Sequence, residues 1–392
     1  RWAEQDGCVP GGALTRLPVE AWLFDPVDDN IRPTYRFPPN RTLPSHLVTN
    51  RFGWRGDDLS LNKPPATVRI AFVGASTTLG SHFHEHAYPE YVVHWLNLWA
   101  ENQGLSVRFD GINAAREGIG SEDIAAIVET EIMAMEPDLI VYYEGANQFH
   151  MDDLLEGPVD VPTVLGSKPT RALADFLKRF EDHSVVTRRL AELAIAIAER
   201  GGVEPPHVNY ELRWPKGVDE FEPDLESSRL PVSLPDILAD LRNIETMANK
   251  AGADLALGSF VWLVSDGMRV NPLTKRGITR FYQRLYAPFR YADIRRLADF
   301  QNRVLESHAR QRGLWFFDLA ALFPKKPGYF VDGIHLTEAG VRLQAWIVLA
   351  ELLPRIRQRL ESGMWPRPDI LPLQTHPGIG PIRTVERVCP EN

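Results

Sequence analysis

Apolar residues along the chain fall into short continuous runs that alternate with segments of helical periodicity. A run over 67–73 ends at Gly74, as expected for a buried strand that enters a turn. Apolar and aromatic residues then recur at helical spacing over 91–99, and a strand-like segment follows over 107–112. The order strand, helix, strand predicts that an α/β unit begins near residue 67.

The same rhythm continues through the next forty or so residues. Apolar residues at helical spacing predict a helix from Ser121 to Met135, with Ser121 as its N-cap and acidic residues in its first turn. The apolar run over 139–143 predicts another strand. Strands separated by helices predict an α/β fold with a doubly wound, mostly parallel sheet flanked by helices. Ligands of such sheets bind beyond the carboxyl ends of the strands.

The alternation lapses after Gln148, and we interpret 149–235 as a helical insertion or cap. It contains a helical stretch over 171–200 and then a tract with many proline and acidic residues. The alternation resumes with predicted helices over 235–250, 294–311 and 337–360 and predicted strands over 255–264 and 314–319.

Proline-rich segments flank the α/β domain, which we place at 66–362. Residues 1–65 predict an extended N-terminal arm, and residues 363–392 a C-terminal tail that packs on the domain. Cys8 and Cys389 lie in these segments. A disulfide between them in an oxidising compartment and two separate thiols are equally compatible with the sequence.

Composition and charge narrow the classes of partner. The net charge of −9 and the 44% hydrophobic content describe a globular chain without a general attraction to nucleic acid or anionic lipid. No uninterrupted apolar run reaches the roughly 18 residues of a membrane span. Because the chain begins at Arg1, we expect that an upstream signal or membrane anchor was removed and that the protein is periplasmic or extracellular, with the cytoplasm as the alternative. The oligomeric state has no signature in the sequence.

The segment Gly74-Ala75-Ser76-Thr77-Thr78-Leu79-Gly80 directly follows the first predicted strand. Small residues there allow a serine to stand exposed at the carboxyl end of the sheet, where its Oγ can meet a substrate and its N–H an oxyanion. A turn that cradles a phosphate is the alternative. The glycine spacing of a dinucleotide site and the Gly-Lys-Ser/Thr of a P-loop are both absent, which disfavours those nucleotide sites.

A second candidate, Asp332-Gly333-Ile334-His335, precedes the last predicted helix. An aspartate three residues before a histidine can accept the Nδ1 hydrogen and leave Nε2 free to take a proton from a serine. A purely structural histidine, with Asp332 as a helix cap, is the alternative.

These segments resemble the blocks of the SGNH (GDSL-like) hydrolase family, which has further blocks between them. Asn113-Ala114-Ala115-Arg116-Glu117-Gly118 follows the second predicted strand, and Gly145-Ala146-Asn147 follows the third, in the family's order. The resemblance, over 67–147 and 236–360, implies a flavodoxin-like SGNH fold with catalytic Ser76, Asp332 and His335. It also implies an oxyanion hole formed by the N–H groups of Ser76 and Gly118 and the amide of Asn147. Ala75 and Gln148 depart from the family's usual acids, and Thr78 departs from the Gly-x-Ser-x-Gly of α/β-hydrolases.

The resemblance implies a serine esterase that cleaves O-acyl esters of small molecules or carbohydrates, O-acetyl esters among them, without a cofactor. An acyltransferase that passes the same acyl group to a sugar, and a non-catalytic carbohydrate-binding module, are the alternatives. We expect Arg116, Gln148 and His82 to contact the substrate. His82, His84 and His86 would share one face of a strand and could bind zinc, but a helix is expected to begin near them, which favours a polar loop at the cleft.

Overall fold

The computed structural model describes residues 24–26, 32–33, 36–37, 39–42, 47–80, 84–156, 210–265, 267–270, 275–367 and 382–384. Its centre is a five-stranded sheet in which all neighbouring strands are parallel. The strands are β2 (Thr67–Gly74), β3 (Arg108–Asn113), β4 (Leu139–Tyr143), β7 (Asp254–Gly258) and β8 (Trp315–Phe317). The predicted doubly wound parallel sheet is therefore confirmed.

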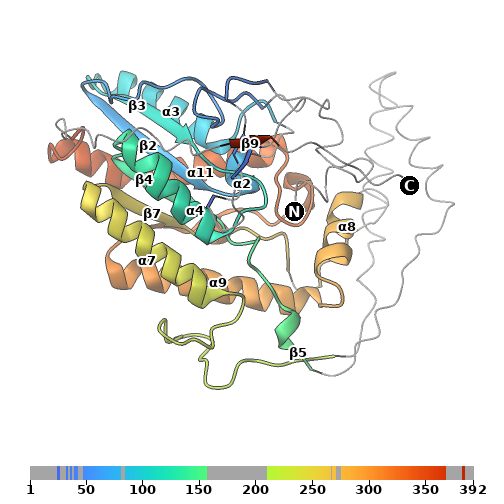
Figure 1. Ribbon diagram of the computed structural model, residues 1–392. Helices are drawn as coiled ribbons and strands as arrows, with labels where there is room; N and C mark the ends of the chain where they lie inside the picture. The colour runs from blue at the N-terminus through green and yellow to red at the C-terminus, as the bar shows by residue number, and fades with distance from the viewer. Residues whose placement is uncertain are drawn as a thin grey trace, which may run out of the picture.

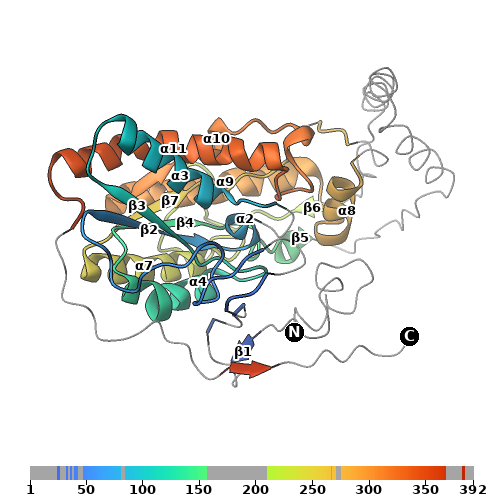
Figure 2. The ribbon, with the colours of Figure 1, turned by 90° about the horizontal axis from the view of Figure 1, so that it is seen from above.

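The strand order β3-β2-β4-β7-β8 is the flavodoxin-like order, in which the chain reverses its direction of winding between β2 and β4. Helices α4 (Ser121–Ile127) and α7 (Leu234–Ala251) cover one face of the sheet, and α3 (Tyr88–Asn102) and α11 (Glu338–Glu361) cover the other (Figures 1 and 2). Helix α9 (Tyr291–Arg312) contacts β7 and β8. This topology makes the carboxyl ends of β2 and β4 the expected place for a ligand.

Short elements complete the described part of the chain. They are β1 (Phe24–Pro26), α2 (Ser76–Leu79), η2 (Val128–Ile132), η3 (Met133–Met135), η4 (Asp152–Leu154), β5 (Leu155–Glu156), β6 (Glu211–Leu212), α8 (Arg276–Leu285), α10 (Leu319–Leu322), η5 (Pro327–Tyr329) and β9 (Ile382–Thr384). Among the described helices, none is long and apolar enough to span a membrane.

The strands of the sheet are long apolar runs because helices bury them on both faces. Every residue of β2 and of β4 is buried. Two expectations at element ends are wrong. Gly120, rather than Ser121, is the N-cap of α4, because the Ser121 hydroxyl bonds Asp240 of α7 at 2.5 Å. The strand expected over 255–264 ends at Gly258, and the buried residues that follow have no partner strand.

Segments outside the sheet pack against the helical segments around it or pair with one another. Trp54, in the predicted N-terminal arm, is 1% exposed and donates its Nε1 hydrogen to Glu131 at 2.7 Å. Strands β5 and β6 pair antiparallel and join the two described ends of the predicted insertion. Its expected helix over 171–200 lies outside the described residues, as do Cys8 and Cys389.

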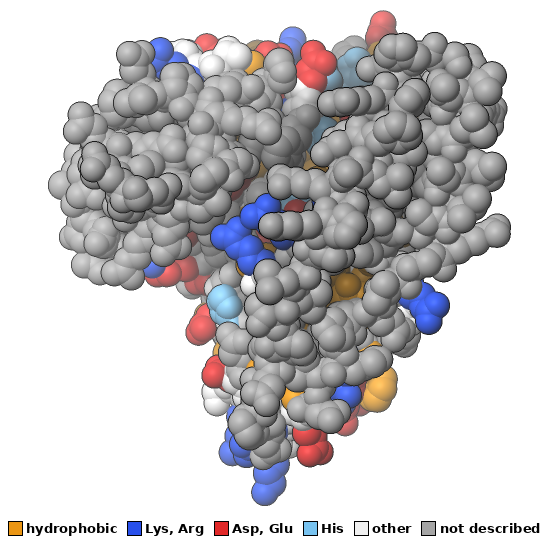
Figure 3. Space-filling view, turned by 90° about the vertical axis from the view of Figure 1, so that its right-hand side faces the viewer, with side chains coloured by type: hydrophobic (Ala, Val, Ile, Leu, Met, Phe, Trp, Pro, Cys, Tyr) orange, Lys and Arg blue, Asp and Glu red, His pale blue; other side chains and the backbone are white. Residues whose placement is uncertain are grey.

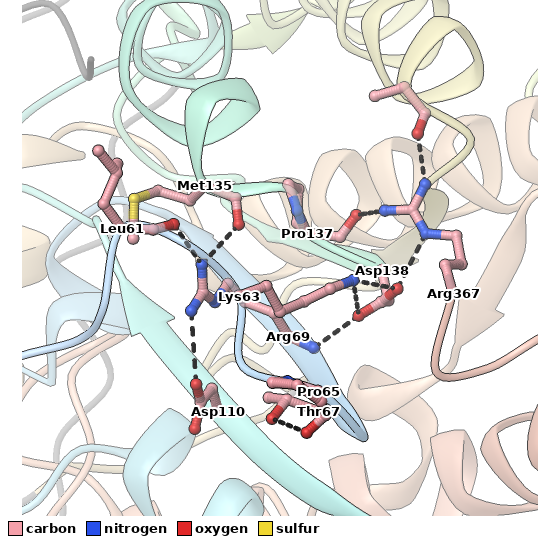
Figure 4. Close-up of polar contacts among 11 residues, drawn as sticks. Leu61, Lys63, Pro65, Thr67, Arg69, Asp110, Met135, Pro137, Asp138 and Arg367 are labelled. Atoms are coloured by element: carbon pink, nitrogen blue, oxygen red, sulfur yellow. Dashed lines mark hydrogen bonds and ion pairs between the residues drawn. The ribbon is translucent and has the colours of Figure 1, made fainter. Parts of the chain in front are cut away.

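The amino-terminal ends of the strands carry a buried ionic cluster centred on Asp138 (Figure 4). The Asp138 carboxylate, 0% exposed, accepts hydrogen bonds from Lys63 Nζ at 2.9 and 3.0 Å, from the backbone N–H of Arg69 at 2.7 Å and from Arg367 Nε at 2.9 Å. Lys63 precedes β2 and Arg367 follows α11, so the cluster ties both flanking segments to the end of the sheet opposite α2.

Candidate active site

Ser76 is the first residue of α2 and stands directly beyond the carboxyl end of β2. The turn is tight: a Cβ on Gly74 would lie 2.2 Å from the carbonyl oxygen of Tyr143 in β4, so only glycine fits there. Thr78, on the first turn of α2, donates its hydroxyl to the same Tyr143 oxygen at 2.9 Å. The contact fixes α2 between the ends of β2 and β4, where the topology places the ligand site.

The structure brings Ser76, His335 and Asp332 together from segments more than 250 residues apart. His335 Nε2 lies 2.8 Å from Ser76 Oγ, and His335 Nδ1 lies 2.8 Å from Asp332 Oδ2. In the tautomer that this arrangement favours, Nδ1–H donates to Asp332 and Nε2 accepts from the serine hydroxyl. A nucleophile, a base and a group that orients the base are thus within hydrogen-bonding distance.

Asp332 also shapes the turn that carries His335. Its Oδ1 accepts the backbone N–H groups of Ile334 at 2.9 Å and of His335 at 2.8 Å. Asp332 is therefore not the cap of α11, whose N-cap is Thr337. One carboxylate oxygen fixes the turn and the other fixes the imidazole, which limits the rotation of both side chains.

Opposing effects set the protonation of this pair. Burial alone would lower the pKa of His335, but the hydrogen bond and charge of Asp332, with the charges of Glu117 and Glu144, raise it above its ordinary value. Burial would raise the pKa of Asp332, but its bonds to His335 and to backbone N–H groups lower it below its ordinary value. The imidazolium that forms when His335 takes a proton is therefore stabilised.

Helix α8 forms a wall behind the turn that carries His335, and no sequence pattern predicted this helix. A Cβ on Gly333 would lie 2.3 Å from the ring of Phe281, and Leu263 N–H donates to the Gly333 carbonyl at 2.8 Å. The residues Ile278, Phe281 and Tyr282 are buried at helical spacing. This spacing was the available signal, in a stretch that is otherwise rich in arginine.

The second and third blocks of the family resemblance also meet at this end of the sheet. Gly118 has a left-handed backbone with φ +70°, which favours glycine. Asn147 donates one Nδ2 hydrogen to the Ile119 carbonyl at 2.9 Å, so its amide lies against the loop of Gly118. An amide has two such hydrogens, which leaves one for another acceptor. The oxyanion roles of Ser76, Gly118 and Asn147 stay predictions.

The expected substrate contact of Arg116 is wrong. Its side chain is 1% exposed, and Nη2 donates to both carboxylate oxygens of Glu131 at 2.7 Å. A guanidinium buried beneath the loop in this way cannot reach a substrate in the cleft. Gln148 is partly exposed, and its Oε1 accepts the N–H of Ser121 at 2.6 Å. It braces α4, and its contact with substrate stays a prediction.

The histidine-rich loop is only partly described, and His82 lies outside the described residues. His84 Nε2 lies 2.9 Å from the carbonyl of Leu336, and the exposed His86 packs edge-on against Tyr91. Residues 84–86 form bends rather than a strand. In the described part of the chain, no group of three His, Cys, Asp or Glu side chains is placed to hold a metal ion.

Arg55 supports this loop from the N-terminal segment. Its Nη2 donates to the carbonyls of His84 at 2.9 Å and of Glu85 at 2.7 Å. Phe52 and Trp54 stack with ring centroids 4.7 Å apart, so the aromatic and basic residues over 50–55 anchor the segment.

A small cavity opens beside Ser76 and His335. Its volume is about 10 Å³, close to the room needed for one water molecule. It is lined by Ser76, Thr77, Gly80, His84, Tyr143, Ile334, His335, Leu336, Val341 and Gln344. Figure 3 faces the side of the molecule on which α2 and α8 lie, and described side chains of both charges and a histidine reach the surface there.

Comparison with known proteins gives distant likenesses only. No family model matches the sequence, and no curated protein matches it. An acetylxylan esterase from Geobacillus stearothermophilus is similar with 15% identity and a TM-score of 0.41, over 75% of this chain and 96% of that one. A GDSL-like lipase from Bacteroides thetaiotaomicron is similar with 13% identity and a TM-score of 0.33, over 74% of this chain and 88% of that one. Likenesses at this level assign no function, so the residue roles rest on the contacts within the chain itself.

Proposed function

We propose that the chain is a serine esterase that cleaves O-acyl esters through an acyl-enzyme on Ser76. The observation that carries this proposal is the continuous series of contacts from Ser76 Oγ through His335 to Asp332, with 2.8 Å at each step. A serine hydroxyl is a weak nucleophile unless a base removes its proton, and the pair supplies that base with its orienting acid. Ser76 is partly exposed, so a substrate can approach the hydroxyl that Nε2 faces.

The reaction has two halves. His335 Nε2 accepts the Ser76 proton while Oγ forms a bond to the ester carbonyl carbon, and the imidazolium then gives that proton to the departing alcohol. Water repeats the sequence on the acyl-enzyme, and the acid leaves. In each half the carbonyl oxygen carries a negative charge, for which Ser76 N–H, Gly118 N–H and the free Asn147 amide hydrogen are the proposed donors.

We further propose that the acyl group is short, and that O-acetyl esters, including those of carbohydrates, are the natural substrate class. Support comes from the cavity beside Ser76, which has room for little more than one water-sized group. Apolar side chains of Ile334, Leu336 and Val341 line it. An acetyl methyl fits such a space better than a long chain does.

The test is hydrolysis of p-nitrophenyl acetate by the purified protein and by Ser76→Ala. Ser60→Ala is a matched control, because Ser60 is exposed and its carbonyl contacts Arg69 near the amino-terminal end of β2, the end opposite Ser76. We expect Ser76→Ala to lose about 10³-fold or more of kcat, since the acyl-enzyme can no longer form, and Ser60→Ala to keep it. An unchanged rate in Ser76→Ala would overturn the proposal.

The same assay separates hydrolysis from transfer and measures acyl preference. We expect free acetate to be the main product, and the rate to fall from acetate to butyrate to octanoate esters. Acetate release that requires an added sugar acceptor would identify a transferase instead.

A further inference from the structure

Glu144 is a buried carboxylate that takes no direct part in the proposed reaction. It lies between β4 and the turn that carries Asn147, and it is 4% exposed. Among the described residues it forms no ion pair with a lysine or an arginine. Buried carboxylates without a cation are rare because the loss of hydration is costly. Burial raises the pKa of Glu144 above its ordinary value, and the backbone N–H groups of the turn and the charge of His335 oppose this rise. A carboxyl group at this position therefore calls for an explanation.

The hydrogen bonds of Glu144 are directed at the turn itself. Its Oε1 accepts the backbone N–H groups of Ala146 and of Asn147, both at 2.8 Å. Asn147 in turn donates from Nδ2 to Ile119 O at 2.9 Å. The carboxylate therefore holds the main chain of Asn147, and the position of the Asn147 amide follows from it.

The carboxylate is also one of several groups around His335. Asp332 approaches from the turn of His335 itself, Glu117 from the loop after β3, Glu144 from the loop after β4, and Ser76 from α2. Burial raises the pKa of the phenol of Tyr286, the C-cap residue of α8, and the nearby charges of Glu144 and Asp332 raise it further. The charges of Glu117 and Glu144 contribute to the raised pKa of His335.

Resting on the proposed esterase function, we infer that Glu144 is a positioning residue with two effects. Through the N–H groups of Ala146 and Asn147 it fixes the turn that presents the Asn147 amide to the oxyanion. Through its charge it favours the imidazolium form of His335, which appears when Ser76 gives up its proton. Glu144 need not touch the substrate for either effect.

Glu144→Gln separates the effects, because the amide keeps the shape and one acceptor oxygen and removes the charge. We expect the acid limb of kcat/KM against pH to move about 0.5 to 1 unit lower, with a loss in kcat of about tenfold or less. The control is Glu129→Gln, since Glu129 is exposed on η2, and it should leave both quantities unchanged.

Glu144→Ala removes the acceptor as well. We expect kcat to fall by about 10² to 10³, the loss typical of one oxyanion donor. Asn147→Ala should cost about the same. The double variant should cost little more than either change alone, because Glu144 acts through Asn147.

Two results would overturn the inference: an acid limb that does not move in Glu144→Gln, or losses in Glu144→Ala and Asn147→Ala that multiply in the double variant. Thermal unfolding of each variant shows whether it is folded. If Glu144→Ala does not fold, the inference is tested by the pH of the acid limb of kcat/KM in Glu144→Gln. Failure of the esterase proposal is distinguishable, since Ser76→Ala would then keep its activity.

Discussion

His335 must be neutral to accept a proton from Ser76, so the pKa of its imidazole sets the pH at which the pair can work. Burial lowers that pKa, and Asp332 together with Glu117 and Glu144 raises it by more, to a value above the ordinary 6.5. In the proposed mechanism the neutral form is the active one, so a raised pKa moves the onset of activity to higher pH.

We therefore expect kcat/KM for acetate esters to rise with pH through an apparent pKa above 6.5. Asp332→Asn should move this limb to lower pH and reduce kcat by about 10⁴-fold, because the amide favours the wrong tautomer of His335. A pH series from 5 to 9 on both proteins measures the two effects. An apparent pKa at or below 6.5 for kcat/KM in the unaltered protein would contradict this view of the site. Equal kcat values for the unaltered protein and Asp332→Asn would contradict it as well.

At the scale of elements, the strands were the most predictable part of the chain. The run over 139–143 coincides with β4, because a strand buried on both faces is a continuous apolar segment. The sequence also predicted Ser76 and Asn147 directly after strands. Because the carboxyl ends of parallel strands lie at the same edge of a sheet, side chains in these positions lie near one another. Periodicity could not show whether Arg116 points toward the cleft or beneath the loop, since that depends on Glu131.

Helix ends and helix α8 were less predictable for a physical reason. The helix expected from Ser121 to Met135 is α4 followed by the π-helical η2 and the 3-10 turn η3. The sequence of that segment does not contain the partner on α7 that takes the Ser121 hydroxyl. In α8, the buried face consists of Ile278, Phe281 and Tyr282 alone, and arginines surround it, so the helical periodicity of this stretch is weak.

At the scale of the whole molecule, Asp138 joins parts of the chain that no local pattern connects. Its partners Lys63 and Arg367 lie 75 and 229 residues away in sequence. Buried ion pairs are costly to break, because the partner that remains is a charge without compensation. The flanking segments thus depend on one carboxylate for part of their attachment.

We expect Asp138→Ala to lower the free energy of unfolding by about 3 to 5 kcal/mol, measured by urea denaturation. The exposed Asp57→Ala serves as control and should change it by less than about 0.5 kcal/mol. Because Asp138 lies at the end of the sheet opposite Ser76, folded Asp138→Ala should keep its kcat. A loss of stability no larger than that of the control would show that the cluster contributes little.

The most direct test of Ser76 as an activated nucleophile is its reaction with a fluorophosphonate probe, followed by mass spectrometry of the digested protein. The expected result is a single adduct, on the peptide that contains Ser76, with labelling slowed by at least about 10³-fold in His335→Ala. An adduct on another residue, the absence of any adduct, or equal labelling of His335→Ala would contradict the assignment.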